Sequence, residues 1–538
     1  MFSRWLTLSI IFVVLLSVVS PASAAPLAAP APLAITPTSG PPGTLVRYTG
    51  TGFTPNGHVT VLLVPGFGLV VDEVTADPSG GISGDFAMPG PGPELNFGPI
   101  GVFAIDETTR QESPPTTFTL TQPSVTGTSW FFAEGSTQPP FDTWFLVQNP
   151  TAVPANVTFT FQFQGGGSTV RSFVVGPTSR FSLFANQIIP GVAFSTRIDA
   201  DQPVRAERAM YVGFDGDDVT GIPAPNRTWL FAEGSTQPPF HTWLLLQNPN
   251  NVTANATITY FLSGGAAPVT QSLSLPPISR TSVFVNQVLP NAAFSSRVDS
   301  DQPIVVERAQ YRFPGNAATA KAGLNVPSTT FYFPDAKTSF RPIRGTSVPF
   351  DSFLLLENPT GTPATANITL FRSGGTTFTF TQFLPPTSRQ TIFLNQILPN
   401  ASFGIRVQAS QPIIAERSMF FGREPRGAMA TPGSPDLATT WFLPEGSTQP
   451  PFTEQVFILN PHGSVMTAQV DFQLPGGQIV RRNFAIGPTR SLTINVNSII
   501  PNSPVSIRVM TTLSSVVERQ MFFSKLGSLG GTDSLGMR

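Results

Sequence analysis

The stretch Val157–Gly167, VTFTFQFQGGG, decides the fold class of this chain. Val and Phe alternate with Thr and Gln, which is the period of two typical of a β-strand with one buried face. The three glycines that follow favour a tight turn, because glycine accepts positive φ angles. Paired glycines recur at the equivalent point further along, at Gly264-Gly265, Gly374-Gly375 and Gly476-Gly477. The pattern predicts antiparallel hairpins repeated along the chain.

Two landmarks indicate that this hairpin belongs to a unit copied four times. An Asn-Pro that ends the first long strand recurs after 99, 110 and 102 residues, and a Glu-Arg pair recurs after 100, 109 and 102. About seven short strands per hundred residues are typical of an immunoglobulin-like antiparallel sandwich. We therefore expect an all-β chain of tandem immunoglobulin-like β-sandwiches, arranged as beads or a rod. The landmarks are Asn149, Asn248, Asn358 and Asn460, and Glu207, Glu307, Glu416 and Glu518.

The composition supports an all-β fold and excludes several classes of function. Charged residues make up 11% of the 538 residues and hydrophobic residues 40%, a hydrophobic share too high for a disordered chain. The net charge of −1 gives no basic field, so no nucleic-acid partner is expected. Cysteine is absent, which excludes disulfides and thiolate metal sites.

The N-terminus has the pattern of an export signal. Arg4 precedes an apolar run over Leu6–Val19, and Ala22-Ser23-Ala24 supplies a cleavage motif. The run is shorter than the ~20 residues of a spanning helix. We expect a cleaved signal peptide over 1–24, no later transmembrane segment, and a secreted or cell-surface location.

The remaining chain divides into five modules with short connections. Repeat 3 departs from the others, because FPDAKTSFRPIRGTSVPF at 333–350 replaces the shorter FAEGSTQPPF and adds Lys337, Arg341 and Arg344. The expected parts are a Pro/Ala linker over 25–32, an N-terminal module over 33–121, repeat 1 over 127–222, repeat 2 over 226–323, repeat 3 over 327–432, repeat 4 over 438–523 and a linker-like tail over 524–538.

Two resemblances to known families extend this division. ITPTSGPPGTLVRYTGTGF from Ile35 and ADPSGGISGDFAMP at 76–89 resemble strands of an IPT/TIG immunoglobulin-like domain, whose bacterial members are surface or secreted modules. Residues 127–538 resemble an uncharacterised β-repeat of large secreted bacterial proteins, through W-F-x-A-E-G-S-T, L-x-N-P and E-R-x-M-Y-F. This second resemblance implies an extracellular modular protein and brings no catalytic residue with it.

The recurring charges are the first candidate site. Two glutamates could serve a glycosidase as acid and nucleophile if their carboxyls lay ~5–10 Å apart in a cleft. Four near-equal copies, one of which lacks the glutamate of the AEGST motif, favour a structural Arg–carboxylate network and an inter-repeat joint. No catalytic residue is assigned. The expected network comprises Glu134, Glu233, Glu445, Glu207, Glu307, Glu416, Glu518, Arg197, Arg297, Arg406 and Arg508.

Aromatic residues on the first long strand are the second candidate. Trp144, Trp243 and Phe353 occupy one repeat position, where repeat 4 carries Gln455. Core packing is the plain interpretation, because burying such a ring contributes about 2–3 kcal/mol. Since a glutamine is accepted there, an exposed ring that stacks on a sugar is the alternative.

Signals for metals and modification are weak. The three histidines share no spacing, so no zinc site or other cofactor is expected. FDGDDVTG holds Asp215, Asp217 and Asp218, spaced somewhat like a calcium loop but without its distal glutamate. A solvated linker is favoured, and calcium stays the alternative. Glycosylation is left open at the sequons of Asn156, Asn226, Asn251, Asn255, Asn367 and Asn400.

These observations predict an exported, non-enzymatic structural or adhesive protein of the bacterial cell surface or extracellular matrix. The expected partner is a surface or matrix component, either protein or polysaccharide, or a second copy of the chain. The alternative is a secreted carbohydrate-binding protein that uses the repeat aromatics, and an enzyme is the third interpretation.

Overall fold

The described part of the chain is built almost entirely from antiparallel strands, so the all-β class is confirmed. The chain divides into two compact units, the first ending at Leu120 and the second running from Thr121 to Arg538. Within the described ranges no helix is long and apolar enough to cross a bilayer. The predicted signal peptide and residues 25–28 lie outside these ranges. The computed structural model describes residues 29–40, 44–64, 69–88, 98–120, 127–262, 266–312, 317–338, 340–343, 346–424, 426–525 and 527–538.

The N-terminal unit contains two antiparallel sheets, ordered β1-β3-β6 and β2-β8-β7-β4-β5. Val46 and Tyr48 of β3 are buried while Arg47 and Thr49 are exposed, as the alternation of a half-buried strand requires. Its strands are β1 (Ala34–Thr36), β2 (Ser39–Gly40), β3 (Leu45–Gly50), β4 (His58–Val64), β5 (Leu69–Thr75), β6 (Ile82–Ala87), β7 (Gly98–Asp106) and β8 (Thr116–Leu120).

Repeat 1 consists of two four-stranded sheets, ordered β12-β11-β14-β9 and β13-β10-β15-β16. Val157, Phe159 and Phe161 of β11 are buried, as the predicted alternation requires, and β11 and β12 form the predicted hairpin. The alternation is wrong at the end of the strand, where Phe163 is only partly buried and Gln162 is buried, because Gln162 accepts a hydrogen bond from Gln247 of repeat 2 at 2.7 Å. The strands are β9 (Ser129–Phe132), β10 (Phe141–Asn149), β11 (Ala155–Phe163), β12 (Ser168–Val175), β13 (Ser179–Phe184), β14 (Phe194–Ala200), β15 (Arg205–Val212) and β16 (Asp215–Thr220), and the short helix η1 (Ala185–Gln187) follows β13.

Repeats 2 to 4 keep the same pairing, except that one long strand replaces β14 and β15 in each. Repeat 2 comprises β17 (Asn226–Phe231), β18 (Phe240–Asn248), β19 (Ala254–Leu262), β20 (Val269–Leu275), β21 (Ser279–Phe284), α1 (Val285–Val288), β22 (Phe294–Arg312) and β23 (Ala317–Ala322). Repeat 3 comprises β24 (Ser328–Lys337), β25 (Arg341–Ile343), β26 (Thr346–Val348), β27 (Phe350–Asn358), β28 (Ala364–Arg372), β29 (Thr377–Leu384), β30 (Ser388–Phe393), α2 (Leu394–Ile397), β31 (Ser402–Phe421) and β32 (Gly427–Pro432). Repeat 4 comprises β33 (Ala438–Leu443), β34 (Thr453–Asn460), β35 (Met466–Gln473), β36 (Ile479–Ile486), β37 (Arg490–Asn495), η2 (Val496–Ser498), β38 (Ser506–Lys525) and β39 (Ser528–Leu535).

Two of the strands that end the repeats, β16 and β39, lie where the sequence predicted a solvated linker and a tail, whereas β23 and β32 lie within the predicted bounds of repeats 2 and 3. The Asp215–Asp218 segment is the buried strand β16, and the tail 524–538 contains β39, which pairs with β38. The linker predictions are therefore wrong at these positions. The physical reason is close packing. β16, β23, β32 and β39 contact one another, which requires small side chains, and β16 and β39 are therefore rich in Gly, Ser, Thr and Asp, residues that are also common in turns.

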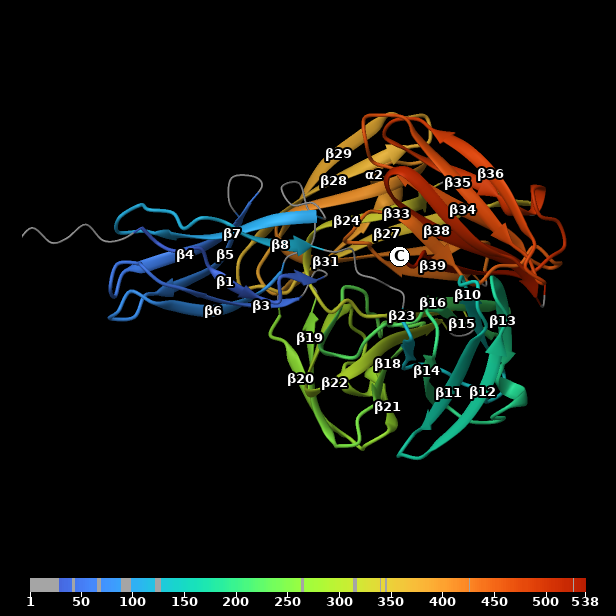
Figure 1. Ribbon diagram of the computed structural model, residues 1–538. Helices are drawn as coiled ribbons and strands as arrows, with labels where there is room; N and C mark the ends of the chain where they lie inside the picture. Colours follow the sequence, from blue (N-terminus) through green and yellow to red (C-terminus); the bar gives the residue numbers. More distant parts are fainter. Residues whose placement is uncertain are drawn as a thin grey trace, which may run out of the picture. The chain divides into compact units, whose positions relative to one another are not determined.

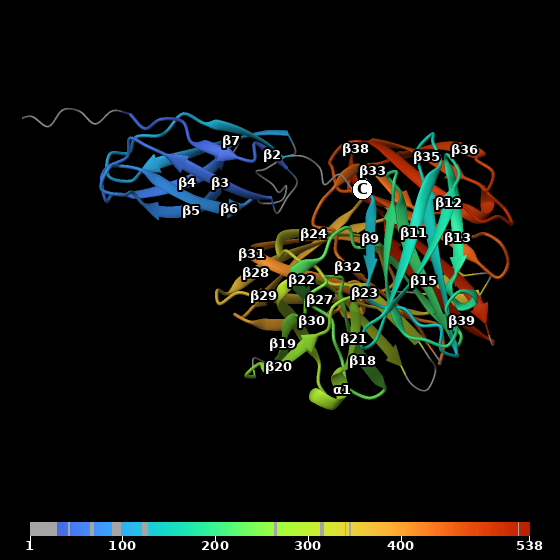
Figure 2. The same ribbon diagram turned by 60° about the horizontal axis from the view of Figure 1, so that its bottom comes forward.

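These four strands, here called the axial strands, close the four repeats into a ring (Figures 1 and 2). β16 contacts β23, β23 contacts β32, β32 contacts β39, and β39 contacts β16. Repeat 4 thus meets repeat 1 as repeat 1 meets repeat 2, about a pseudo-four-fold axis. The C-terminus lies among the repeats in Figure 1, and Met537 packs into the core of repeat 1. An arrangement as beads or a rod is wrong for these four repeats.

Candidate functional site

Every joint of the ring contains a buried ion pair that links the Glu-Arg pairs of neighbouring repeats. Within each pair the glutamate faces one neighbouring repeat and the arginine faces the other, because successive side chains of a strand point to opposite faces. The fourth pair joins residues 312 positions apart in the sequence and closes the ring. The N–O distances are 2.8 Å for Arg208–Glu307, 2.8 Å for Arg308–Glu416, 2.9 Å for Arg417–Glu518 and 2.9 Å for Arg519–Glu207.

The glutamate of the repeated AEGST motif lies at the same joints. It pairs with an arginine near the start of a strand in the next repeat, in β21, β30 or β13, so it serves three of the four joints. Repeat 3 lacks this glutamate, and the carbonyl oxygen of Pro334 there accepts a hydrogen bond from Ser491 at 2.6 Å. The three pairs are Glu134–Arg280 at 2.7 Å, Glu233–Arg389 at 3.0 Å and Glu445–Arg180 at 3.5 Å.

The four strand arginines of the predicted network make other interactions. Arg197 and Arg297 pair with an aspartate two residues along their own strand, at 2.9 and 2.7 Å. Arg508 pairs with Asp471 at 2.6 Å, and Arg406 lies 5.6 Å from the ring centroid of Phe371. The prediction omits the arginines that span the joints, Arg208, Arg308, Arg417 and Arg519. Their sequence signal is the Glu-Arg dipeptide itself.

A single carboxylate, that of Asp215, caps the ring axis. It accepts backbone N–H bonds from three other repeats, at 3.1 Å from Ala318, 2.9 Å from Ala428 and 2.8 Å from Gly531. Gly216 holds the equivalent position in repeat 1 and also donates. Burial raises the pKa of Asp215 well above its usual range, and the four N–H donors act in the opposite direction.

The neighbouring aspartates face cations of the protein. Asp217 pairs with Lys321 at 2.9 Å, and Asp218 contacts Arg519. No group of three or more His, Asp or Glu in the described ranges could hold a metal ion. The segment for which a solvated linker was favoured, with calcium as the alternative, is the strand β16, and Asp217 and Asp218 face Lys321 and Arg519 inside the ring.

The predicted ligand-stacking aromatics each stack on a phenylalanine of the adjacent strand. They are partly exposed, and the stacking covers one face of each ring. The centroid distances are 4.5 Å for Trp144–Phe184, 4.6 Å for Trp243–Phe284 and 4.8 Å for Phe353–Phe393.

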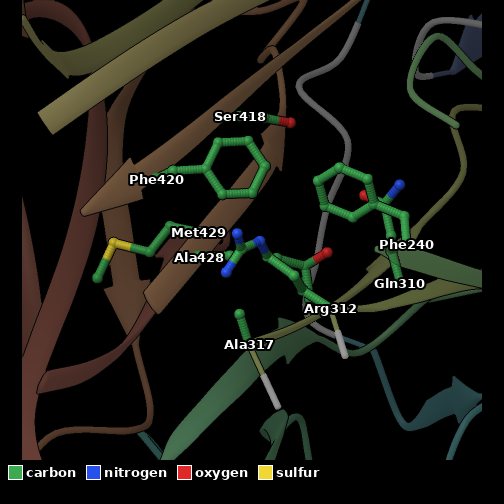
Figure 3. Close-up of a pocket in the computed structure, with 9 residues that line it drawn as sticks. Phe240, Gln310, Arg312, Ala317, Ser418, Phe420, Ala428 and Met429 are labelled. Atoms are coloured by element: carbon green, nitrogen blue, oxygen red, sulfur yellow. The ribbon is translucent and has the colours of Figure 1, made fainter. Parts of the chain in front are cut away.

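The joint between repeats 2 and 3 is closely packed (Figure 3). Phe240 and Phe420 approach to 5.8 Å between ring centroids, and Arg312 lies beside them. The cavity that they line has a volume of about 10 Å³, which is the space of a single water molecule.

The joint that closes the ring contains a much larger cavity, here called the closing cleft. Its volume is about 480 Å³, within the range of about 300–1,000 Å³ typical of small-molecule sites. Repeat 1 contributes Trp144, Tyr211 and Arg180, and repeat 4 contributes Glu445 and Phe452. Asp142 and Lys525 also line it, with 3.7 Å between their charged atoms.

Buried carboxyls gather behind this cleft. Burial raises the pKa of Glu445 to about 7, although Arg180 acts in the opposite direction. Glu454 is fully buried where repeat 1 has Thr143, and burial raises its pKa well above the usual range. Near the axis, burial raises the pKa of Asp217 to about 7. The folded ring therefore takes up protons that the unfolded chain releases.

The free energy of unfolding is expected to fall as the pH rises from about 4.5 to about 7. These groups have a higher pKa in the folded state, so they stabilise the fold when protonated, and this contribution is lost as the pH rises through the folded pKa. Chemical denaturation at intervals between pH 4.5 and pH 8 measures the fall. Glu454→Gln imitates the protonated acid and should make the free energy of unfolding less dependent on pH in this range. A free energy of unfolding that rises through this window would contradict the assignment.

Comparisons with known proteins identify no family for this chain. No family model matches, and no curated protein matches. Among solved structures, a tetra-tandem repeat from the extending region of a large adhesion protein is 13% identical, with a TM-score of 0.14, and the match covers 75% of this chain and 99% of that one. A Ca²⁺-stabilised adhesin of an Antarctic bacterium that binds ice is 10% identical, with a TM-score of 0.18 and coverage of 75% and 97%. Thermotoga maritima 1070 is 18% identical, with a TM-score of 0.18 and coverage of 19% and 95%. The function is therefore argued from the geometry.

Proposed function

We propose that this chain is an exported, non-enzymatic structural and adhesive protein of the bacterial cell surface or extracellular matrix. One observation carries the proposal: the Glu-Arg pairs that recur with each repeat are buried and paired across the joints, where they hold the ring together. A catalytic carboxylate must reach substrate, and the glutamates of these four Glu-Arg pairs are buried away from solvent. The export pattern of residues 1–24 supports a location outside the cell.

The two units have different parts in this proposal. The N-terminal unit is an IPT/TIG-like module, and the ring is a rigid body that presents loops and strand faces to a surface or matrix component. The buried pairs favour rigidity, because opening one joint would leave buried charges without their partners. The partner is a protein, a polysaccharide or another copy of the chain.

Labelling of intact cells tests this function. We expect an antibody against the chain to label the outside of unpermeabilised cells or the surrounding matrix in electron micrographs. The purified protein should be inactive in a hydrolase screen on glycoside, ester and peptide substrates. Label confined to the cytoplasm would overturn the location, and turnover of any of these substrates would overturn the non-enzymatic role.

Carbohydrate binding through the repeat aromatics is the second candidate. The observation that favours it is confined to one joint: Trp144 lines the closing cleft, which is large enough for a ligand. Trp243 and Phe353 have the same stacking partners in their repeats, so they serve as internal comparisons.

A further inference from the structure

The closing cleft differs from the equivalent joints in the state of its ion pair. Glu445 and Arg180 are 3.5 Å apart, whereas the same pair measures 2.7 and 3.0 Å at the two other joints that have it. Among the glutamates of the AEGST motif in the described part of the chain, Glu445 is the one with a buried oxygen, Oε2, that accepts no hydrogen bond; Arg180 Nε also lacks a partner, as Arg280 Nε does at the joint of repeats 1 and 2. Only 6% of Glu445 is exposed, yet it lines the cavity. The Glu445–Arg180 pair is thus looser than its counterparts and lies beside the cleft, so a ligand with hydroxyl groups could donate to the carboxylate and accept from the guanidinium.

The apolar part of the cleft is aromatic and comes from both repeats. Trp144, Tyr211, Phe452 and Phe523 line it, and Trp144 has only one face covered by Phe184. Ser182, Ser447 and Gln449 add hydroxyl and amide groups. Aromatic faces beside a few convergent polar groups are the usual composition of a site for a small, partly polar ligand.

The charges of the cleft balance. Asp142 and Lys525 form one opposite pair at 3.7 Å, and Glu445 and Arg180 form the other. A charged ligand would have to separate one of these pairs, so the balance favours a neutral ligand. A sugar ring fits all three conditions: its C–H face stacks on an aromatic ring, its hydroxyls donate to a carboxylate, and its oxygens accept from a guanidinium.

We propose that the closing cleft is a binding site for a neutral saccharide, formed only when repeats 1 and 4 meet. The sugar lies on the free face of Trp144, and its hydroxyls reach Glu445 and Arg180. Because the site needs both end repeats, ligand binding stabilises the closed ring. This deepens the second candidate function, carbohydrate binding, on which it rests, and it goes beyond the structural role, which does not require the cleft to be occupied.

Titration of the full mature chain tests the site, with tryptophan fluorescence and calorimetry as readouts. The probes are glucose, galactose, mannose, N-acetylglucosamine, cellobiose, maltose and chitobiose at up to about 10 mM. Cosedimentation with insoluble cellulose or chitin tests whether the site also binds the end of a polysaccharide chain, and not only a free sugar. We expect at least one probe to bind, with a loss of at least tenfold in affinity for Trp144→Ala.

Symmetry of the ring supplies matched controls. Trp243→Ala removes the same stacking in repeat 2 and should bind as the parent does, and Glu445→Gln should weaken binding while Glu233→Gln should not. The inference is overturned if no probe binds, if Trp243→Ala loses binding equally, or if binding survives both Trp144→Ala and Glu445→Gln. None of these results depends on whether the chain is adhesive.

Discussion

Replacing Arg519 with methionine is expected to lower the free energy of unfolding by about 3–5 kcal/mol, the cost of removing one partner from a buried ion pair. Arg519 donates to Glu207 at 2.9 Å and also contacts Asp218 and the carbonyl oxygen of Glu445. The substitution leaves the Glu207 and Asp218 carboxylates buried without this guanidinium. Equilibrium denaturation in urea measures the change.

Two comparisons separate ring closure from a general charge effect. Arg308→Met removes the same contact from the joint of repeats 2 and 3, and it should cost about as much. Arg110→Met removes an exposed arginine of the N-terminal unit and should cost no more than about 1 kcal/mol. If Arg519→Met behaved like Arg110→Met, repeat 4 would not be joined to repeat 1.

Replacing Asp215 with alanine is expected to destabilise all four repeats at once. The carboxylate satisfies N–H groups of Ala318, Ala428 and Gly531, and each buried donor left without a partner costs about 1–3 kcal/mol. We expect a loss of roughly 4 kcal/mol or more in the free energy of unfolding, from the same three donors. Amide hydrogen exchange at these three residues should become faster together.

An exposed aspartate of the same repeat is the control for this substitution. Asp201 accepts hydrogen bonds from Asn156 at the surface, so Asp201→Ala should leave exchange at the axis unchanged. If the three axial amides kept their protection in Asp215→Ala, the carboxylate would not be the group that caps the axis.

Local structure could be predicted from the sequence, because it depends on residues close together in the chain. Alternation over Val157–Phe161 determines which face of β11 is buried, and the Glu-Arg spacing reveals the repeat. Closure could not be predicted, since a rod and a ring use the same contact between repeat n and repeat n+1. The angle between neighbouring repeats determines whether they form a rod or a ring, and that angle depends on packing along whole strands.

Part of the candidate site could be predicted from the sequence and part could not. The role of the AEGST glutamate at a joint follows from its recurrence, whereas Asp215 occurs in one repeat only and resembles a loop residue. Trp144 was identifiable as a partly exposed aromatic, but its cleft combines it with Glu445, about three hundred residues away. Only ring closure brings these residues together, and no local sequence pattern indicates that the ring closes.

Zero-length cross-linking tests ring closure most directly. Lys525 and Asp142 carry exposed charges 3.7 Å apart, and the side chains of the other two lysines, Lys321 and Lys337, are buried. Treatment of the dilute protein with a carbodiimide should form an amide between Lys525 and Asp142 within one chain. Mass spectrometry should detect the joined peptides, and Asp142→Asn should abolish them. If this link were absent from the monomer, or formed only between different chains, repeats 1 and 4 would not meet and the ring would be wrong.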